Sequence, residues 1–300
     1  MKSVHTPVLL HEVIQGLISD RRPPWYLDGT LGGAGHASAI AEAFKGKINL
    51  IGLDRDPQAI ERAQESLKGK AEKIILACES FRNLDKVLDA NGVKAVDLIL
   101  FDLGISSDEL ESSGRGFTFM KDEQLLMTMG DPARYAFTAR DMANEWKEMD
   151  LANAIYAYGE ERFARRIAKA IVAYREKKAI ETSGELAEIV KGAVPGFARR
   201  GKIHPATKTF QAFRITVNDE LNALREGLLK GYQRLNAKGR MAVISFHSIE
   251  DRIVKEFYKE QGKSGGMILT KKPITPSAQE IAENPRSRSA KLRIIEKTTI

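Results

Sequence analysis

Cysteine is almost absent from this sequence: Cys78 is the only one among 300 residues. An internal disulfide needs two cysteines and a cysteine-rich zinc site needs several, so both are excluded on this count. The five histidines, at positions 5, 11, 36, 204 and 247, lack the spacing of metal ligands. We therefore expect no bound metal.

Long apolar runs are missing too. No stretch of 18 or more apolar residues occurs, as a membrane-spanning helix would need. The N-terminus carries charges and histidines in place of the apolar core of a signal peptide. Together with 43% hydrophobic and 29% charged residues, these features predict a cytoplasmic globular protein without a membrane partner.

Acidic residues are outnumbered by basic ones, 40 against 47, which gives a net charge of +7 and a pI near 9.3. Such a surplus favours a polyanionic partner such as RNA, although a merely basic soluble enzyme has the same composition. Basic clusters at Ala198–Lys202, Lys271–Lys272 and Asn284–Arg293 favour RNA. The last cluster adds Ser and Asn, which also bond phosphate oxygens.

The rest of the chain is organised around one glycine-rich stretch. A short apolar run, Trp25–Asp28, passes into Gly29–Gly35, and a helical pattern follows from Ala37 to Phe44. Strand, glycine loop and helix N-terminus is the order in which α/β folds hold nucleotides. Glycines admit a ligand close to the backbone, and the free N–H groups favour electron-rich atoms. A tight turn that binds nothing would use the same residues.

An acidic residue ends the next predicted strand, Asn49–Leu53. Asp54 lies 19 residues after Gly35, and a carboxylate at this place in an α/β fold accepts both hydroxyls of an adenosine ribose. NAD and S-adenosylmethionine both contain that ribose. These residues therefore leave the ligand open between the two.

Strands and helices alternate through the first hundred residues. Predicted strands at Lys73–Ala77 and Val96–Phe101 are separated from their neighbours by helical patterns at Pro57–Leu67 and Leu84–Ala90. This order predicts a parallel sheet with right-handed crossovers.

From Ser106 to about His204 the alternation stops, and every pattern is helical or loop. The candidate helices are Asp141–Trp146, Asp150–Tyr158, Ala164–Arg175 and Ser183–Val194. The α/β pattern then resumes with one long helix, Thr207–Leu235, a strand, Met241–Ser245, and a closing antiparallel pair, Met267–Lys271 with Leu292–Glu296. A helical insertion into an α/β domain explains this order.

Eight segments together resemble the ribosomal RNA small subunit methyltransferase H family. They are HTPVLL at 5–10, DGT at 28–30, DLGISS at 102–107, RGFTF at 115–119, YGEERF at 158–163, HPATKTFQ at 204–211, SFHSIEDR at 245–252 and NPRSRS at 284–289. The segments occur in the family's order along the chain. With the basic residues that follow the last segment, they extend from residue 5 to residue 293. The resemblance therefore covers the whole chain.

The resemblance implies a class I S-adenosylmethionine-dependent methyltransferase, Rossmann-like, with an inserted all-helical domain. The methyltransferase domain would comprise residues 1–110 and 205–300, and the insertion, residues 111–204, would recognise RNA. The implied reaction is methylation of N4 of one cytidine in the decoding centre of bacterial 16S rRNA within the small ribosomal subunit. The family's cofactor contacts fall here on Ala34, Gly35, His36, Asp54, Phe81, Asp102 and Glu109.

Two places depart from the family pattern. The family has an amide or imidazole where this chain has Glu109, and its Asp-Gly-Pro-Leu-Asp-Met-Arg-Met segment is replaced by Asp122–Met129. The second change removes a Gly-Pro turn, an Asp and an Arg, so we expect an altered lid over the active site.

Two residues are catalytic candidates. Methyl transfer to an exocyclic amine needs an acceptor that orients the amine through its N–H bonds. Asp102 follows the fourth strand and is the predicted acceptor, although a strand-end carboxylate also caps turns. His247 follows the fifth strand; it either stacks on the base or relays a proton, or it is a structural histidine. His36 and Phe81 each admit a structural alternative as well, as a neighbour of a helix cap and as a core residue.

Three functions are therefore compared. The first is a 16S rRNA cytosine-N4 methyltransferase. The second is an NAD-dependent oxidoreductase that uses the same loop and Asp54. The third is a non-catalytic RNA-binding or ribosome-assembly protein that keeps a vestigial cofactor pocket, which the changes at Glu109 and Glu123–Thr128 would fit.

Overall fold

The chain divides into two compact units, and each is described by itself. The computed structural model describes residues 7–18, 25–105, 110, 113–199, 201 and 203–298. The two units meet in the sequence after Gly104 and after Glu220. We call the part up to Gly104 together with the part from Leu221 the sheet unit, and Ile105–Glu220 the helical unit. Within the described ranges, no helix is both long and apolar enough to cross a membrane.

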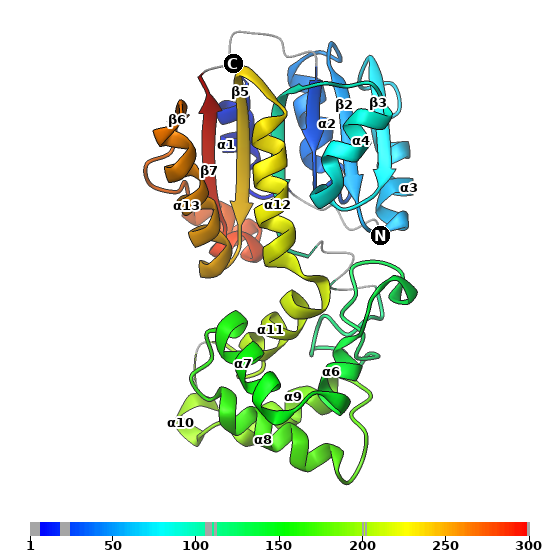
Figure 1. The fold of residues 1–300 in the computed structure, drawn as a ribbon, viewed down its shortest axis with the longest axis vertical. Helices are drawn as coiled ribbons and strands as arrows, with labels where there is room; N and C mark the ends of the chain where they lie inside the picture. The colour runs from blue at the N-terminus through cyan, green and yellow to red at the C-terminus, as the bar shows by residue number, and fades with distance from the viewer. Residues whose placement is uncertain are drawn as a thin grey trace. The chain divides into compact units, whose positions relative to one another are not determined.

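A seven-stranded sheet forms the centre of the sheet unit (Figure 1). Its strand order is β3-β2-β1-β4-β5-β7-β6; β1 to β5 run parallel, and β7 is antiparallel to both of its neighbours. The strands are β1 (Trp25–Asp28), β2 (Asn49–Asp54), β3 (Lys73–Cys78), β4 (Val96–Asp102), β5 (Leu235–Ser245), β6 (Gly266–Ile268) and β7 (Lys291–Lys297). The predicted parallel sheet and its antiparallel close are both confirmed.

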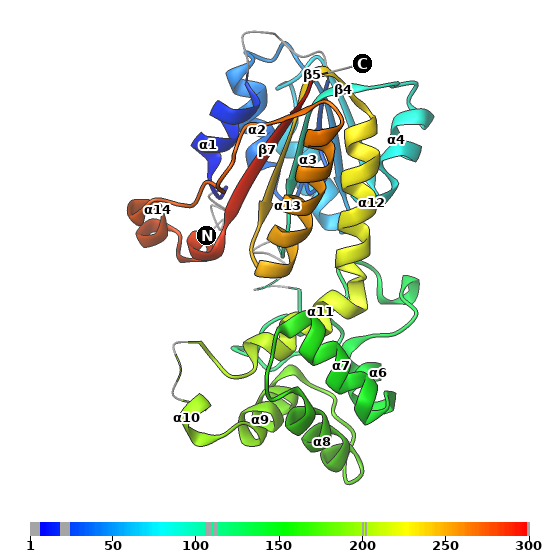
Figure 2. The same cartoon turned by 60° about the vertical axis from the view of Figure 1, so that its left-hand side comes forward.

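The period of two along β4 separates the faces of the sheet. Leu98 and Leu100 lie in one core cluster with side chains of α1 (Leu10–Leu17), α2 (Gly35–Ala43) and α3 (Pro57–Leu67). Ile99 points the other way, to Gly231 of α12 (Glu220–Gln233). That face is also covered by α4 (Leu84–Ala90) and α13 (Ser248–Lys263), as Figures 1 and 2 show. Helices therefore cover both faces of the sheet.

The predicted start of β5 needs a correction. The strand begins at Leu235, not at Met241, because Val96 pairs with Leu235 before the register shifts and Leu98 pairs with Arg240. Residues 235–240 therefore belong to an irregular stretch of strand. The pair Thr6-Pro7 in the sequence is typical of an N-cap followed by the first helical residue. Thr6 lies outside the described residues, and α1 begins at Leu10.

Among the described residues of the helical unit, six helices surround a second core. They are α6 (Ala139–Glu145), α7 (Glu148–Gly159), α8 (Ala164–Arg175), α9 (Ser183–Ala193), α10 (Gly196–Arg199) and α11 (Thr207–Asn218). We expected one helix from Thr207 to Leu235, but Asp219, at φ 49°, breaks it into α11 and α12. Phe210, Phe213 and Val217 of α11 pack into the helical core. This packing places α11 in the helical unit, although the predicted boundary at residue 205 assigned it to the methyltransferase domain.

The segment that departs from the family pattern is ordered within the helical unit. Asp122 Oδ1 accepts the backbone N–H of Gly184, and Glu123 Oε2 accepts that of Gly116. Asn218, buried on α11, donates to the carbonyl of Met127 and accepts the N–H of Met129. Hydrogen bonds to two backbone N–H groups and to the Asn218 side chain therefore fix this segment without a Gly-Pro turn.

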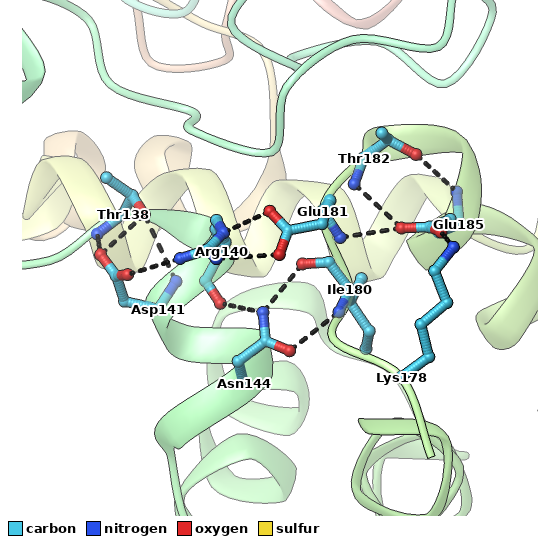
Figure 3. A network of polar contacts seen from close by, with 9 residues as sticks. All are labelled: Thr138, Arg140, Asp141, Asn144, Lys178, Ile180, Glu181, Thr182 and Glu185. Atoms are coloured by element: carbon cyan, nitrogen blue, oxygen red, sulfur yellow. Dashed lines mark hydrogen bonds and ion pairs between the residues drawn. The ribbon is translucent and has the colours of Figure 1, made fainter. Parts of the chain in front are cut away.

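Two capping boxes are linked in the helical unit (Figure 3). Thr138 with Asp141 caps α6, and Thr182 with Glu185 caps α9. Arg140 bonds both carboxylate oxygens of Glu181. In the same network Asn144 exchanges two hydrogen bonds with the backbone of Ile180, at 2.8 and 2.9 Å. These contacts fix the start of α9 against α6.

Two glycines of the helical unit give a matched test of its packing. A Cβ on Gly159 would lie 2.5 Å from the carbonyl oxygen of Lys208, whereas a Cβ on Gly192 would meet nothing within 4 Å. We expect Gly159→Ala to lower the free energy of unfolding by about 1–3 kcal/mol through overpacking. Gly192→Ala should raise it by about 0.5–1 kcal/mol, because alanine favours the helix. Urea denaturation measures both; equal effects would contradict the close approach of α7 and α11.

Candidate cofactor and catalytic site

Three carboxylates stand at one edge of the sheet, where parallel strands end. Asp28 ends β1 opposite Gly52 and Leu100, so Asp54 and Asp102 lie two residues further along β2 and β4. Strand order reverses at β1 and β4, which is where open α/β sheets bind ligands. The fold thus assembles at this point residues that are more than 70 positions apart in the sequence.

Asp28 is the most buried of the three carboxylates. Its Oδ2 accepts the Tyr26 hydroxyl at 2.9 Å, and its Oδ1 accepts the backbone N–H of Thr30 at 3.2 Å. Burial raises the pKa of Asp28 to about 6, with a smaller contribution from the Asp54 charge. The sequence did not single out Asp28 as a site residue, because its role as an anchor of the loop depends on the close approach of Tyr26 and Thr30.

The glycine loop is hydrogen-bonded to the end of β4, and there is open space on another side of the loop. Gly29 donates to the Leu100 carbonyl, and Thr30 Oγ1 accepts the Asp102 N–H at 2.6 Å. Gly32 and Ala34 have φ of 50° and 59°. A Cβ on Gly32 or Gly33 would meet nothing within 4 Å, so there is open space beside both residues. The loop therefore has the close-approach geometry of a cofactor cradle.

The N-terminal motif braces this cradle, which sequence reasoning missed. A Cβ on Gly35 would lie 2.6 Å from Pro7 Cγ. His36 is buried, and its Nε2 donates to the carbonyl of Val8 at 2.9 Å. The signal was present in the HTPVLL motif, but nothing local indicates which part of the chain it packs against.

Asp54 faces the loop from β2. Its Oδ2 accepts the Gly32 N–H at 2.8 Å, and its Oδ1 accepts the Asp56 N–H at 2.9 Å. Each oxygen keeps a second lone pair, so the carboxylate can still accept two ribose hydroxyls. Burial raises the pKa of Asp54, partly offset by these two hydrogen bonds. These remaining acceptor positions on Asp54 fit the predicted contact with the cofactor ribose.

Phe81 opens a short 3₁₀ helix after β3, η1 (Phe81–Asn83). Its ring lies 4.9 Å from that of Phe101, tilted by 31°. A Cβ on Gly227 of α12 would lie 2.4 Å from the Phe81 ring. One side of the ring therefore belongs to the core, while the side chain as a whole stays only half-buried. Both interpretations of Phe81 from the sequence apply to different parts of this side chain.

Asp102 ends β4 with one carboxylate oxygen unmatched. Its Oδ1 is buried and finds no hydrogen-bond partner among the described residues. Its Oδ2 lies 3.6 Å from His36 Nδ1. Burial, followed by the charges of Asp28 and Glu250, raises the pKa of Asp102 well above its usual range. A buried acceptor without a donor is costly, as expected of a site that a ligand completes.

His247 is held as the N-cap of α13. Its Nδ1 accepts the Glu250 N–H at 3.3 Å, and its Nε2 lies 3.1 Å from Glu250 Oε1. The Glu250 carboxylate in turn accepts the N–H groups of Phe246 and His247, which completes a capping box. Nδ1 is therefore engaged in the cap, whereas the buried Nε2 has no hydrogen-bond partner among the described residues, although it lies close to Glu250. The structural alternative accounts for these contacts, and the catalytic role stays a prediction. Glu109, the last predicted contact, lies outside the described residues.

The sheet order, the single antiparallel strand and the cradle define a class I S-adenosylmethionine-dependent methyltransferase. Protein-family comparison matches residues 2–298 to the MraW methylase family, so the chain belongs to this family. The oxidoreductase alternative is therefore excluded. Three features fit S-adenosylmethionine: the open glycine loop, the two carboxylate oxygens of Asp54 and the half-buried ring of Phe81.

Several relatives are similar over nearly their full length, and all bear the name Ribosomal RNA small subunit methyltransferase H. The Sulfurihydrogenibium sp. protein is 50% identical over 270 residues, covering 90% of this chain and 91% of the relative. The Persephonella marina protein is 46% identical (97% and 98% covered). The Brevibacillus brevis protein is 42% identical (98% of each).

Asp54→Ala tests the ribose contact. We expect the affinity for S-adenosylmethionine to fall by about 2–3 kcal/mol, because a charged bidentate acceptor is lost. Isothermal titration calorimetry measures this, with Glu61→Ala, an exposed acid on α3, as the matched control. Unchanged cofactor affinity in Asp54→Ala, with affinity for RNA reduced instead, would contradict the assignment.

Proposed function

We propose that this chain methylates N4 of one cytidine in the decoding centre of 16S rRNA, with S-adenosylmethionine as methyl donor. The observation that carries the proposal is Asp102: a carboxylate at the carboxyl end of β4 with a buried, unpartnered Oδ1. The names of the relatives give the substrate class, the RNA of the small subunit. Residues 34–36, Asp54, Phe81, Asp102 and Glu109 remain the proposed cofactor contacts.

The reaction needs orientation more than activation. S-adenosylmethionine supplies a sulfonium methyl group, so that the N4–carbon bond forms as the sulfur–carbon bond breaks, and sulfur keeps the electron pair. The amine lone pair is delocalised into the cytosine ring, so an acceptor must hold an N4–H bond to turn the lone pair toward the methyl group. Asp102 Oδ1 supplies that acceptor and takes the proton that N4 loses. The methylated base then leaves neutral.

The helical unit offers a site for an RNA base. A pocket of about 460 Å³ is lined by residues of the YGEERF and HPATKTFQ motifs and of α10. Phe197, 68% exposed, and Phe163 lie there with ring centroids 6.1 Å apart, and the Arg162 guanidinium stands 4.7 Å from the Phe163 ring centroid. Unpaired RNA bases stack on aromatic rings and on arginine planes. This chemistry supports RNA recognition by the insertion.

The basic clusters contain residues with identified partners in the fold and residues that are exposed to solvent. Arg293 is buried and its Nε lies 2.7 Å from Asp251 Oδ1, while Lys291 Nζ lies 3.5 Å from Asp251 Oδ2. Arg199 donates to two carbonyls at the end of α9. Arg286 and Arg288, in the 3₁₀ helix η3 (Pro285–Ser289), are exposed. Phosphate contacts are therefore proposed for the exposed pair, not for the whole segment.

Mapping methylated cytidines tests the function directly. Small-subunit RNA from cells that lack the protein should lose N4-methylation at one decoding-centre cytidine, and the wild-type chain should restore it. Asp102→Asn should lower single-turnover methylation by about 10²-fold or more, the scale of a positioned acid–base group. Its cofactor affinity should change much less. The proposal would be contradicted if this cytidine were still fully N4-methylated without the protein, or if methylation were lost at a different nucleotide.

The paired variant Arg286→Gln/Arg288→Gln tests the RNA contacts. We expect weaker binding to small-subunit RNA and a log–log salt dependence flatter by about one unit per lost phosphate contact. Lys47→Gln/Lys68→Gln removes the same charge from exposed positions that precede β2 and β3, at the opposite edge of the sheet. The control should keep the wild-type slope. Equal slopes for both paired variants would assign Arg286 and Arg288 no part in RNA binding.

A further inference from the structure

His36 and Asp102 meet inside the sheet unit from elements far apart in the sequence. His36 lies in the first turn of α2, and Asp102 is the last residue of β4. Only 7% of the His36 side chain and 17% of the Asp102 side chain are exposed. Water therefore screens their interaction weakly.

The Val8 carbonyl determines the tautomer of His36. A carbonyl oxygen only accepts hydrogen bonds, so the contact of 2.9 Å to Nε2 requires a proton on Nε2. A neutral imidazole then has a bare lone pair on Nδ1, and this atom faces Asp102 Oδ2 at 3.6 Å. A neutral ring beside an ionised carboxylate would thus place two acceptors against each other. A second proton on the ring removes this conflict.

Among the described residues, the charges that shift the pKa of Asp102 are negative. Asp28 and Tyr26 face it from β1, Glu250 faces it from α13, and Thr30 Oγ1 accepts its backbone N–H. His247 Nε2 lies 3.1 Å from Glu250 Oε1, and its Nδ1 accepts a backbone N–H, so this ring is placed against Glu250. Of these groups, His36 is the basic side chain that faces the Asp102 carboxylate directly.

We infer that His36 is a positioning residue: its imidazolium ring, anchored on Val8, keeps Asp102 ionised, so that Oδ1 remains an acceptor for the substrate amine. The raised pKa of Asp102 shows how strongly burial and the neighbouring carboxylates oppose ionisation. This inference deepens the proposed function and depends on it only for the identity of the amine. It assigns to His36 a task separate from contact with the cofactor.

The charge of His36 can be measured without any reaction. In ¹⁵N-histidine-labelled wild-type protein at pH 7, we expect both His36 ring nitrogens to show the shifts of an imidazolium. In Asp102→Asn the ring should become neutral, with the proton retained on Nε2. The ring signals of His11, which is exposed on α1, serve as the control and should be the same in both proteins. A neutral His36 in the wild type would overturn the inference, whether or not the chain methylates cytidine.

Two substitutions separate the charge from the anchor. The amide of His36→Gln can still donate to Val8, and that of His36→Asn can still donate to Asp102, but neither carries charge. An acceptor works only above its pKa, and loss of the imidazolium raises the pKa of Asp102 further. Both variants should therefore methylate about 10–100-fold more slowly than wild type at pH 7 and recover to within about threefold by pH 9.

Asp102→Asn should not recover at any pH, because it has no carboxylate to ionise. Calorimetry of His36→Gln measures the proposed contact of His36 with the cofactor separately, and the methylation rates of all variants are therefore compared at saturating cofactor. Equal losses at every pH in both His36 variants, or a loss in His36→Asn alone, would assign His36 only to anchoring the loop. Loss of cofactor affinity that accounts for the whole rate effect would assign it to the cofactor.

Discussion

The burial of carboxylates at one sheet edge constrains the whole site. Asp28, Asp54 and Asp102 end three parallel strands, and each would bind a proton more tightly there than in water. The fold meets this cost with backbone N–H groups at Asp54, with a hydroxyl and an N–H at Asp28, and with an imidazole at Asp102. Since Asp102 Oδ1 lacks a partner among the described residues, this atom is where a ligand gains most.

The burial of these carboxylates also gives a role to segments that are distant from the glycine loop in the sequence. Pro7 and Val8 do not end any strand, yet Val8 fixes the tautomer of His36, and through it the charge beside Asp102. Glu280 of α14 (Ala278–Glu283) in turn accepts the Leu9 N–H at 2.7 Å. The N-terminal motif is thus held on one side by α14 and on the other by the glycine loop.

Local pattern predicted much of the fold because its signals are local. Glycines after an apolar run, the apolar strand Val96–Phe101 and the helical pattern from Ser183 all arise within a few residues, and the elements that they predict are confirmed. The break at Asp219 was missed, since the apolar positions on both sides keep helical spacing although they face two different cores. Periodicity shows that a face is buried but not against which partner.

The features of the site also divide into those that the sequence predicts and those that depend on tertiary structure. The sequence by itself determined the fold class, the cradle and the acids at the strand ends, because parallel strands bring their carboxyl ends to one edge whatever the loops do. Only the tertiary structure decided which residues have partners. It paired Arg293 with Asp251, used His247 as a helix cap and left Asp102 Oδ1 unmatched. Hydrogen bonds and charge pairs depend on distances of a few ångströms between segments that sequence spacing does not specify.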